Sequence, residues 1–140
     1  KWKPWFSSLT LMFQKEVGMR IVAEPRSKAY GRLSVLCQYR ADVEILFDIP
    51  RQAFIPPPKV TSSIVHITPR SEAVDAPKQK ILERVVSAAF NQRRKMLRAS
   101  LKALGTDPSP KLYAAGILET ARAEELSVED FSKLALEYQS

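Results

Sequence analysis

Residues 49–63 read IPRQAFIPPPKVTSS and separate two runs typical of β-strands, VEILFD at 43–48 and SIVHIT at 63–68. Three consecutive prolines, Pro56 to Pro58, have φ fixed at about −65° and no N–H to donate. The first two also bias the residue before them toward extended geometry. The connection is therefore stiffer than an ordinary loop and cannot be a helix. We expect the two flanking strands to pair as an antiparallel edge of a sheet.

This stiff connection carries one large aromatic residue, Phe54, and one cation, Lys59. An exposed ring on a stiff frame is suited to stacking on a flat group. Two other interpretations are open: the ring packs on its own domain, or the proline run is a polyproline II ligand for an SH3 or WW domain. Enclosure by two strands argues against the peptide ligand. On the residues alone, packing is favoured over binding.

The composition bounds the class of protein. Of the 140 residues, 45% are hydrophobic and 26% are charged, which is typical of a globular protein with one ordinary domain or two small units. No run approaches the roughly 18 apolar residues of a membrane span, and the first residues lack a signal-peptide layout. A single cysteine, Cys37, and a single histidine, His66, argue against a disulfide framework and a metal site. We expect a cytoplasmic protein with neither a metal nor a membrane partner.

The first part of the chain predicts an α/β arrangement. A strand, a helix, a loop and a second helix are expected in that order, at residues 8–14, 15–23, 24–30 and 32–40. The second helix places Leu33, Leu36 and Cys37 on one side. Strands that alternate with helices indicate a layered α/β fold. His66 lies in an alternating strand and is interpreted as a satisfied or exposed strand residue, not as a catalyst.

Beyond a short polar, proline-bounded segment at 69–77, every pattern is helical. Helices are predicted at 78–91, at 93–104, from Pro110 to Gly116, and at 127–137. Gly105 can close the second of them in left-handed geometry, and Ser127 with Asp130 resembles a capping box. The polar segment is interpreted as a linker. It divides the chain into an α/β unit, residues 1–71, and a small all-helical unit, residues 72–140.

The net charge of +7 is concentrated in residues 77–104, where eight basic side chains face only one acidic side chain, Glu83. On the predicted helix at 93–104, Arg94, Arg98 and Lys102 recur every four residues and form one stripe. Any one of them alone could be ordinary solvated surface, but the imbalance of sign favours a phosphate-bearing partner. The candidate RNA-binding cations are Lys59, Arg84, Arg93, Arg94, Lys95, Arg98 and Lys102.

Five stretches resemble the family of ribosomal RNA small-subunit dimethyladenosine transferases. They are SLTLMFQKEV (8–17), SKAYGRLSVLCQY (27–39), FDIPRQAFIPPPKVTSSIVHITP (47–69), AFNQRRKMLRASL (89–101) and RAEELSVEDFSKLA (122–135). Together they span nearly the whole chain in register. Erythromycin-resistance rRNA methyltransferases and mitochondrial transcription factor B are more distant members with the same layout.

The resemblance implies the C-terminal part of a Rossmann-like methyltransferase sheet, followed by a small helical RNA-binding domain. It implies methyl transfer from S-adenosylmethionine to the exocyclic amines of two adjacent adenines in small-subunit rRNA, within a precursor of the 30S subunit. A base must leave its stack to be reached by such an enzyme. In the family it is held between two aromatic rings, and Phe54 matches one of them. Lys59, Ser62 and Ser63 match the same motif, although their role could be purely structural.

The sequence departs from the family in the motifs that bind the cofactor. Its only glycines are at 18, 31, 105 and 116, so no glycine-rich turn after a strand exists, and the family's Asn-Leu-Pro-Tyr motif is absent. We expect a C-terminal portion of a longer protein that does not bind S-adenosylmethionine by itself, with an apolar edge at the strand 8–14. Arg26 stands in a loop where glycine is expected.

Two alternatives come from other classes of protein. The chain could be a non-catalytic RNA-binding or ribosome-assembly module, since its cations alone would serve that function. Residues 122–138 could also be taken for a helix-turn-helix DNA reader. Their acidic side chains argue against DNA, and we interpret them as packing helices.

Overall fold

The computed structural model describes residues 6–71 and 76–139. Three strands form one antiparallel sheet in the order β1-β3-β2: β1 is Leu9–Gln14, β2 is Ala41–Ile49 and β3 is Ser62–Pro69. The central strand places Val65 opposite both Leu11 and Ile45. The predicted pairing of the two strands around the proline-rich loop is therefore confirmed. As expected, β1 lies at an edge of this sheet, where Leu11 and Met12 are 42% and 53% exposed.

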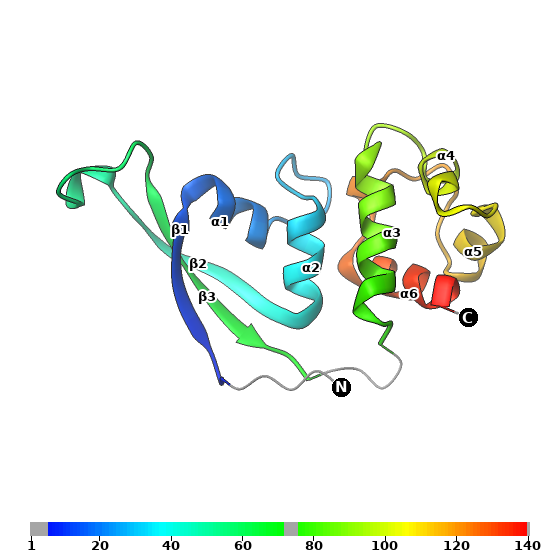
Figure 1. The fold of residues 1–140 in the computed structure, drawn as a ribbon, viewed down its shortest axis with the longest axis horizontal. Helices are drawn as coiled ribbons and strands as arrows, with labels where there is room; N and C mark the ends of the chain where they lie inside the picture. The colour runs from blue at the N-terminus through cyan, green and yellow to red at the C-terminus, as the bar shows by residue number, and fades with distance from the viewer. Residues whose placement is uncertain (1–5, 72–75, 140) are drawn as a thin grey trace.

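Two helices lie on one side of the sheet (Figure 1): α1, Lys15–Val22, and α2, Arg32–Arg40. α1 approaches β3 closely at Gly18, where an added Cβ would lie 3.2 Å from the Cβ of Ser63. α2 buries Ser34 and Val35, whereas Leu33 is 39% exposed. Leu33 is therefore more exposed than Leu36 and Cys37, which the sequence placed on the same side of the helix and which are half-buried. Because α2 lies between α1 on one side and α3 and α6 on the other, its buried residues follow both contacts and not one apolar stripe.

The remaining elements are helical, as predicted: α3 is Gln79–Asn91, α4 is Leu97–Ser100, η2 is Leu101–Leu104, α5 is Ser109–Ala114, η3 is Ala123–Glu125 and α6 is Val128–Gln139. Gly105 ends η2 with φ of 90°, a left-handed conformation that favours glycine. Ser127 and Asp130 exchange hydrogen bonds of 3.1 and 3.0 Å, which is the expected capping box. No helix in the described part of the chain has the length and apolar character needed to cross a membrane.

The single helix predicted at 93–104 is wrong. Residues 92–95 form a turn, and regular helix resumes only at Leu97. The N–H groups of Leu97 and Arg98 donate to the carbonyl groups of Ala121 and Glu119, at 2.8 and 3.1 Å. These long-range bonds replace the bonds to preceding carbonyls that a continuous helix would need. Arg94 therefore does not share a helix face with Arg98.

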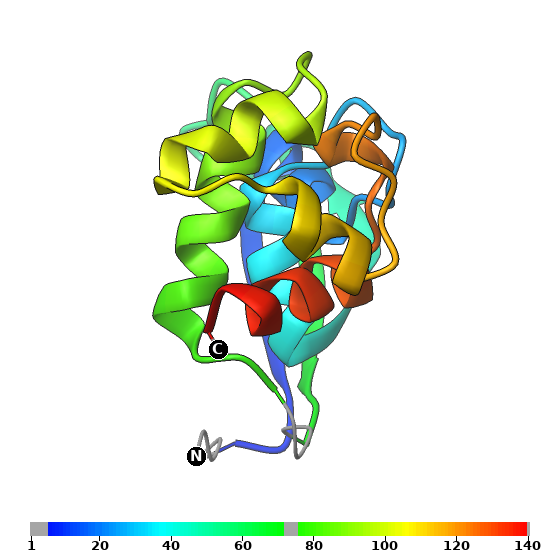
Figure 2. The same ribbon diagram turned by 90° about the vertical axis from the view of Figure 1, so that its right-hand side faces the viewer.

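Helices α2, α3 and α6 pack against one another (Figure 2). One buried cluster joins the two parts of the chain here, with Tyr30 and Val35 from the first part and Phe90 and Phe131 from the helical part. The rings of Tyr30 and Phe90 meet edge to face at 5.9 Å, and those of Phe90 and Phe131 lie 5.5 Å apart. The division at residues 71 and 72 remains a prediction. The shared cluster means that α2 packs with the helical elements as well as with the sheet.

Candidate nucleic-acid interface

The loop between β2 and β3 projects from the end of the sheet (Figure 1). A short turn of 3-10 helix, η1, Arg51–Ala53, precedes Phe54, whose N–H donates to the carbonyl of Arg51 at 3.3 Å. The peptide bond between Ile55 and Pro56 is cis. The Phe54 side chain is half-buried and its neighbour Ile55 is fully exposed. Phe54 therefore keeps part of its surface accessible to solvent, as a stacking platform requires.

Asp48 fastens the base of this loop. Its carboxylate accepts a hydrogen bond of 2.6 Å from the Ser63 hydroxyl and lies 3.2 Å from the ammonium group of Lys15. The N–H of Lys15 also donates to the Thr61 carbonyl at 2.9 Å. The Ser63 hydrogen bond, together with Lys15, holds the pKa of the Asp48 carboxyl below its ordinary value. Both ends of the loop are thus tied to the start of α1.

Sequence reasoning missed Lys15 and Asp48 as partners in this network. Ser63 matches the family motif, and its hydroxyl is committed to Asp48. Ser62 and Ser63 are both buried at the start of β3. Lys59, by contrast, is exposed on the loop itself and free to meet solvent or a ligand.

The candidate RNA-binding cations on α3 and after it fall into two groups. Arg93 and Arg98 have acidic neighbours from the C-terminal part: the side chain of Arg93 lies 3.8 Å from Glu124, and that of Arg98 lies 3.8 Å from Glu119. The guanidinium group of Arg93 also stands 5.7 Å from the centre of the Phe90 ring. The second group is exposed and has no acidic side chain within 4.0 Å among residues 6–71 and 76–139. It consists of Arg84, Arg94, Lys95 and Lys102.

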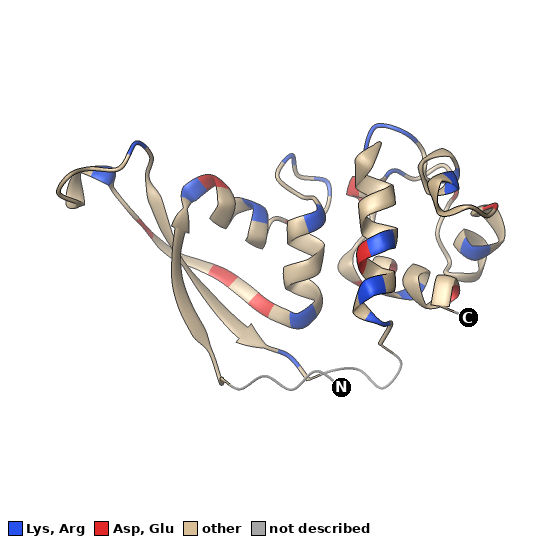
Figure 3. Cartoon of the chain, viewed as in Figure 1, with Lys and Arg blue, Asp and Glu red and all other residues tan. Residues whose placement is uncertain are grey.

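Several basic segments lie along one side of the molecule, and others lie on the lower turns of α3 and near the junction of α2 and β2 (Figure 3). Blue segments follow the upper edge from the loop between β2 and β3, past the start of α1 and the loop before α2, to the turn after α3. α6, with its acidic first turn, lies lower in the same view. This edge carries both the proline-rich loop and the turn at 92–95, which the sequence predicted separately. Basic segments along one edge are suited to contacts with a phosphate backbone.

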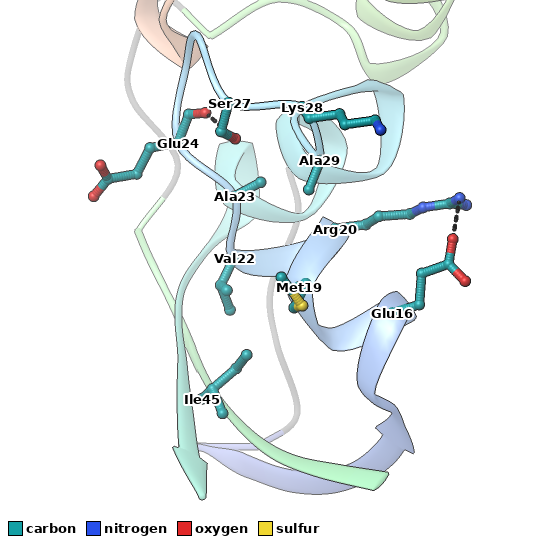
Figure 4. A pocket seen from close by; sticks show the side chains of 10 residues that line it. All are labelled: Glu16, Met19, Arg20, Val22, Ala23, Glu24, Ser27, Lys28, Ala29 and Ile45. Atoms are coloured by element: carbon teal, nitrogen blue, oxygen red, sulfur yellow. Dashed lines mark hydrogen bonds and ion pairs between the residues drawn. The ribbon is translucent and has the colours of Figure 1, made fainter. Parts of the chain in front are cut away.

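A cavity of about 740 Å³ lies between α1, the loop at 24–29 and β2 (Figure 4). Met19, Val22 and Ile45 make its walls apolar. At its rim, Arg20 pairs with Glu16 at 2.7 Å. Sequence reasoning found no cavity here, because its walls come from elements far apart in the chain.

Arg26, in the loop above this cavity, has φ of 71°, a conformation in which glycine is favoured. Its N–H donates to the Glu124 carbonyl at 2.7 Å, and its side chain lies 3.7 Å from Glu125. The cation that stands in place of the expected glycine therefore fastens the loop to η3.

The described residues do not fit an S-adenosylmethionine site. β1 runs directly into α1 without a glycine-rich turn, and Gly18 lies within α1 against Ser63. Gly31, Gly105 and Gly116 follow no strand. Nor do residues 6–71 and 76–139 contain a group of three side chains able to hold a metal ion.

The fold defines a class of protein: chains that contain the C-terminal part of the methyltransferase fold. A crystal structure of a dimethyladenosine transferase from Plasmodium falciparum is similar to 98% of this chain with a TM-score of 0.81 and 25% identity, over 58% of its own length. The structure of the 23S rRNA methyltransferase ErmE is similar over 98% of this chain with a TM-score of 0.61; at 23% identity it supports the fold alone. The predicted fold, the C-terminal part of a methyltransferase sheet followed by helices, is confirmed.

The chain belongs to the ribosomal RNA adenine dimethylase family, whose model matches residues 3–140. Its relatives include the ribosomal RNA small subunit methyltransferase A of Azorhizobium caulinodans, which is 63% identical over 134 residues, and that of Xanthobacter autotrophicus, which is 61% identical over 134 residues. Each alignment covers 96% of this chain and 46% of the relative. The chain thus spans about half the length of the curated relatives it matches.

Proposed function

We propose that this chain forms the RNA-facing part of an adenine dimethyltransferase that acts on small-subunit rRNA. Its substrate would be a precursor of the 30S subunit in the cytoplasm. The observation that carries the proposal is Phe54, a half-exposed ring on a proline-stiffened loop whose base is tied down by Asp48, Ser63 and Lys15. Family membership supports the reaction, and the basic edge supports the type of substrate.

In this proposal, Phe54 is one wall of the site that receives the target adenine. The amine of adenine is a weak nucleophile because its lone pair is delocalised into the ring, so positioning matters more than a strong base. Stacking on an aromatic ring stabilises a flipped base. This stabilisation offsets part of the cost of leaving its own stack. S-adenosylmethionine supplies the methyl group when it is bound to the intact enzyme. The part of that process assigned to this chain is to position the target base.

The exposed cations would hold the RNA backbone. Lys59 stands on the same loop as Phe54, and Arg94 and Lys95 stand on the turn after α3. Contacts of this type fix the position of the substrate and carry no sequence information of their own. Arg93 and Arg98 can also contribute, because their ion pairs are long and exposed and are therefore weak.

The proposal is tested by Phe54→Ala in the protein of natural length, with Ile55→Ala as the matched control. Stacking of a base on an aromatic ring contributes roughly 1–3 kcal/mol. We therefore expect methyl transfer to 30S subunits to fall about 10- to 100-fold for Phe54→Ala, with unchanged affinity for S-adenosylmethionine. Ile55→Ala should retain its activity, because this side chain is fully exposed. Equal activity of the two variants would show that Phe54 is not part of the site that receives the target adenine.

The alternative is a non-catalytic RNA-binding or ribosome-assembly module. Two observations support it. The cations are exposed, and the described residues do not form a binding site for S-adenosylmethionine. The same assay separates the two functions. RNA binding without any methyl incorporation by the unsubstituted protein of natural length would favour the module.

A further inference from the structure

A second, smaller cavity lies inside the helical part, away from Phe54. Its volume is about 310 Å³, at the lower end of the range of small-molecule sites, about 300–1,000 Å³. One wall comes from α3, with Ile81, Arg84 and Val85. The other comes from Leu104, Lys111 and Tyr138, on η2, α5 and α6. Three helical elements after α3 therefore enclose one site together with it.

The two cations of this cavity are disposed differently. The ammonium group of Lys111 donates to the Glu137 carbonyl at 2.9 Å and stands 5.1 Å from the centre of the Tyr138 ring. It is thus held in place by neutral partners, and its charge is not neutralised by them. Arg84 is exposed on α3, and no acidic side chain of the described residues lies within 4.0 Å of it. Both charges are available to an anion.

The remaining lining residues can contact a flat group whose edge carries polar atoms. Ile81 and Leu104 are half-buried and give an apolar surface, and Val85 is almost fully buried in the same wall. The Tyr138 hydroxyl is shielded from solvent and has no hydrogen-bond partner in the described part of the chain. Burial, and then the charge of Asp107, raise the pKa of Tyr138. Its hydroxyl therefore stays protonated and can donate a hydrogen bond.

We propose that this cavity binds one nucleotide, with its phosphate on Arg84 and Lys111 and its base against Ile81 and Leu104. A guanidinium group and an ammonium group are the usual phosphate partners in proteins, and the apolar wall matches the face of a base. The ligand can be a free nucleotide or one nucleotide of an RNA strand. Only binding of an RNA strand rests on the proposed function. The site itself goes beyond that function, because it is separate from Phe54.

The test is a titration of the isotope-labelled full chain with adenosine 5′-monophosphate, monitored by NMR. We expect chemical-shift changes at the residues that line this cavity. Adenosine or inorganic phosphate alone should bind at least tenfold more weakly, because each occupies only half of the site. Arg84→Gln and Lys111→Gln should each weaken binding of the nucleotide at least tenfold. The matched control is Lys80→Gln, an exposed cation one turn earlier on α3 that does not line the cavity, and it should change binding less than twofold.

Thr106→Trp provides a second variant, because Thr106 lines the cavity, is exposed and carries no charge. The added ring should fill the cavity and abolish nucleotide binding while thermal unfolding stays unchanged. Unaltered binding in both Arg84→Gln and Thr106→Trp, or shift changes confined to the loop at 50–61, would overturn the proposal.

The source of the nucleotide is decided by competition with a short single-stranded RNA. Displacement of the mononucleotide from this cavity supports the RNA strand as the ligand, and failure to displace it overturns that source. Phe54→Ala should leave nucleotide binding here unchanged. Nucleotide binding at this cavity therefore tests this inference, and methyl transfer by the Phe54 variant tests the proposed function, so the two can fail separately.

Discussion

Tyr30 is a single side chain on which the packing of two distant segments depends. It is completely buried, and its hydroxyl donates a hydrogen bond of 2.8 Å to the Leu126 carbonyl, just after η3. Burial raises the pKa of this phenol, so it remains a neutral donor at every physiological pH. Its ring also meets Phe90 edge to face. The loop before α2 is thus fastened to the helical part by one polar and one aromatic contact.

Tyr30→Phe should therefore destabilise the protein. The ring is retained, but the buried Leu126 carbonyl loses this donor, which costs about 1–2 kcal/mol. The measurement is the free energy of unfolding by urea. Tyr113→Phe is the control, because Tyr113 is 87% exposed and its hydroxyl can be replaced by water; its effect should stay within about 0.5 kcal/mol. Equal stability of the two variants would mean that the Tyr30 hydrogen bond makes no net contribution.

Among the elements, the turn at 92–95 has the clearest link to function. It replaces the first turn of the helix predicted at 93–104, because the chain pairs with residues 119–122 instead. As a result, Arg94 and Lys95 project from a turn at the upper edge of the molecule, and Arg98 is drawn toward Glu119. The cations remain near one another without forming one helical stripe.

Arg94→Gln combined with Lys95→Gln should weaken RNA binding and flatten its dependence on salt. Each lost phosphate contact reduces the slope of log K against log salt by about 0.7–0.9, so two lost contacts reduce it by up to about 1.8. The measurement is the binding constant for small-subunit rRNA over a range of salt concentrations. Lys133→Gln, on α6 away from this edge, is the control and should leave the slope unchanged. An unaltered slope in the double variant would mean that the turn is only solvated surface.

At the scale of the whole molecule, the buried cluster couples α2 to the helical part. Val35 of α2 is fully buried in this cluster, next to residues of α3 and α6. Val65 is equally buried, but it lies in the sheet beneath Gly18 and outside the cluster. Substitutions at these two valines therefore distinguish loss of the shared cluster from loss of the packing between the sheet and α1.

Val35→Ala should lower stability by about 2 kcal/mol through the cavity it leaves. It should also accelerate amide hydrogen exchange in α3 and α6, because the core is shared. Val65→Ala, the matched control, should cost a similar amount and accelerate exchange mainly in the sheet and α1. Unchanged exchange of α3 and α6 in Val35→Ala would show that the parts unfold independently, and would support the predicted division at residues 71 and 72.

The sequence by itself determined the strands around the proline-rich loop, the helix boundaries near Lys15, Arg32 and Ser127, and the concentration of positive charge after residue 77. These features depend on local physics: periodicity of apolar residues, fixed proline φ angles and capping side chains. The motif residues also sufficed to identify the family, which the comparisons confirm. The proposed role of Phe54 came from that resemblance, since its surroundings alone favoured packing.

Only the tertiary structure decided how Asp48 ties the loop to Lys15, where the helix after Asn91 breaks, and which cations meet acidic neighbours. It also created both cavities. Each of these features is a contact between residues far apart in the chain, whose free energy competes with local preferences and can override them. Sequence patterns record the local preference of a segment. They do not record the distant partner that completes its hydrogen bonds, and that partner fixes the final geometry.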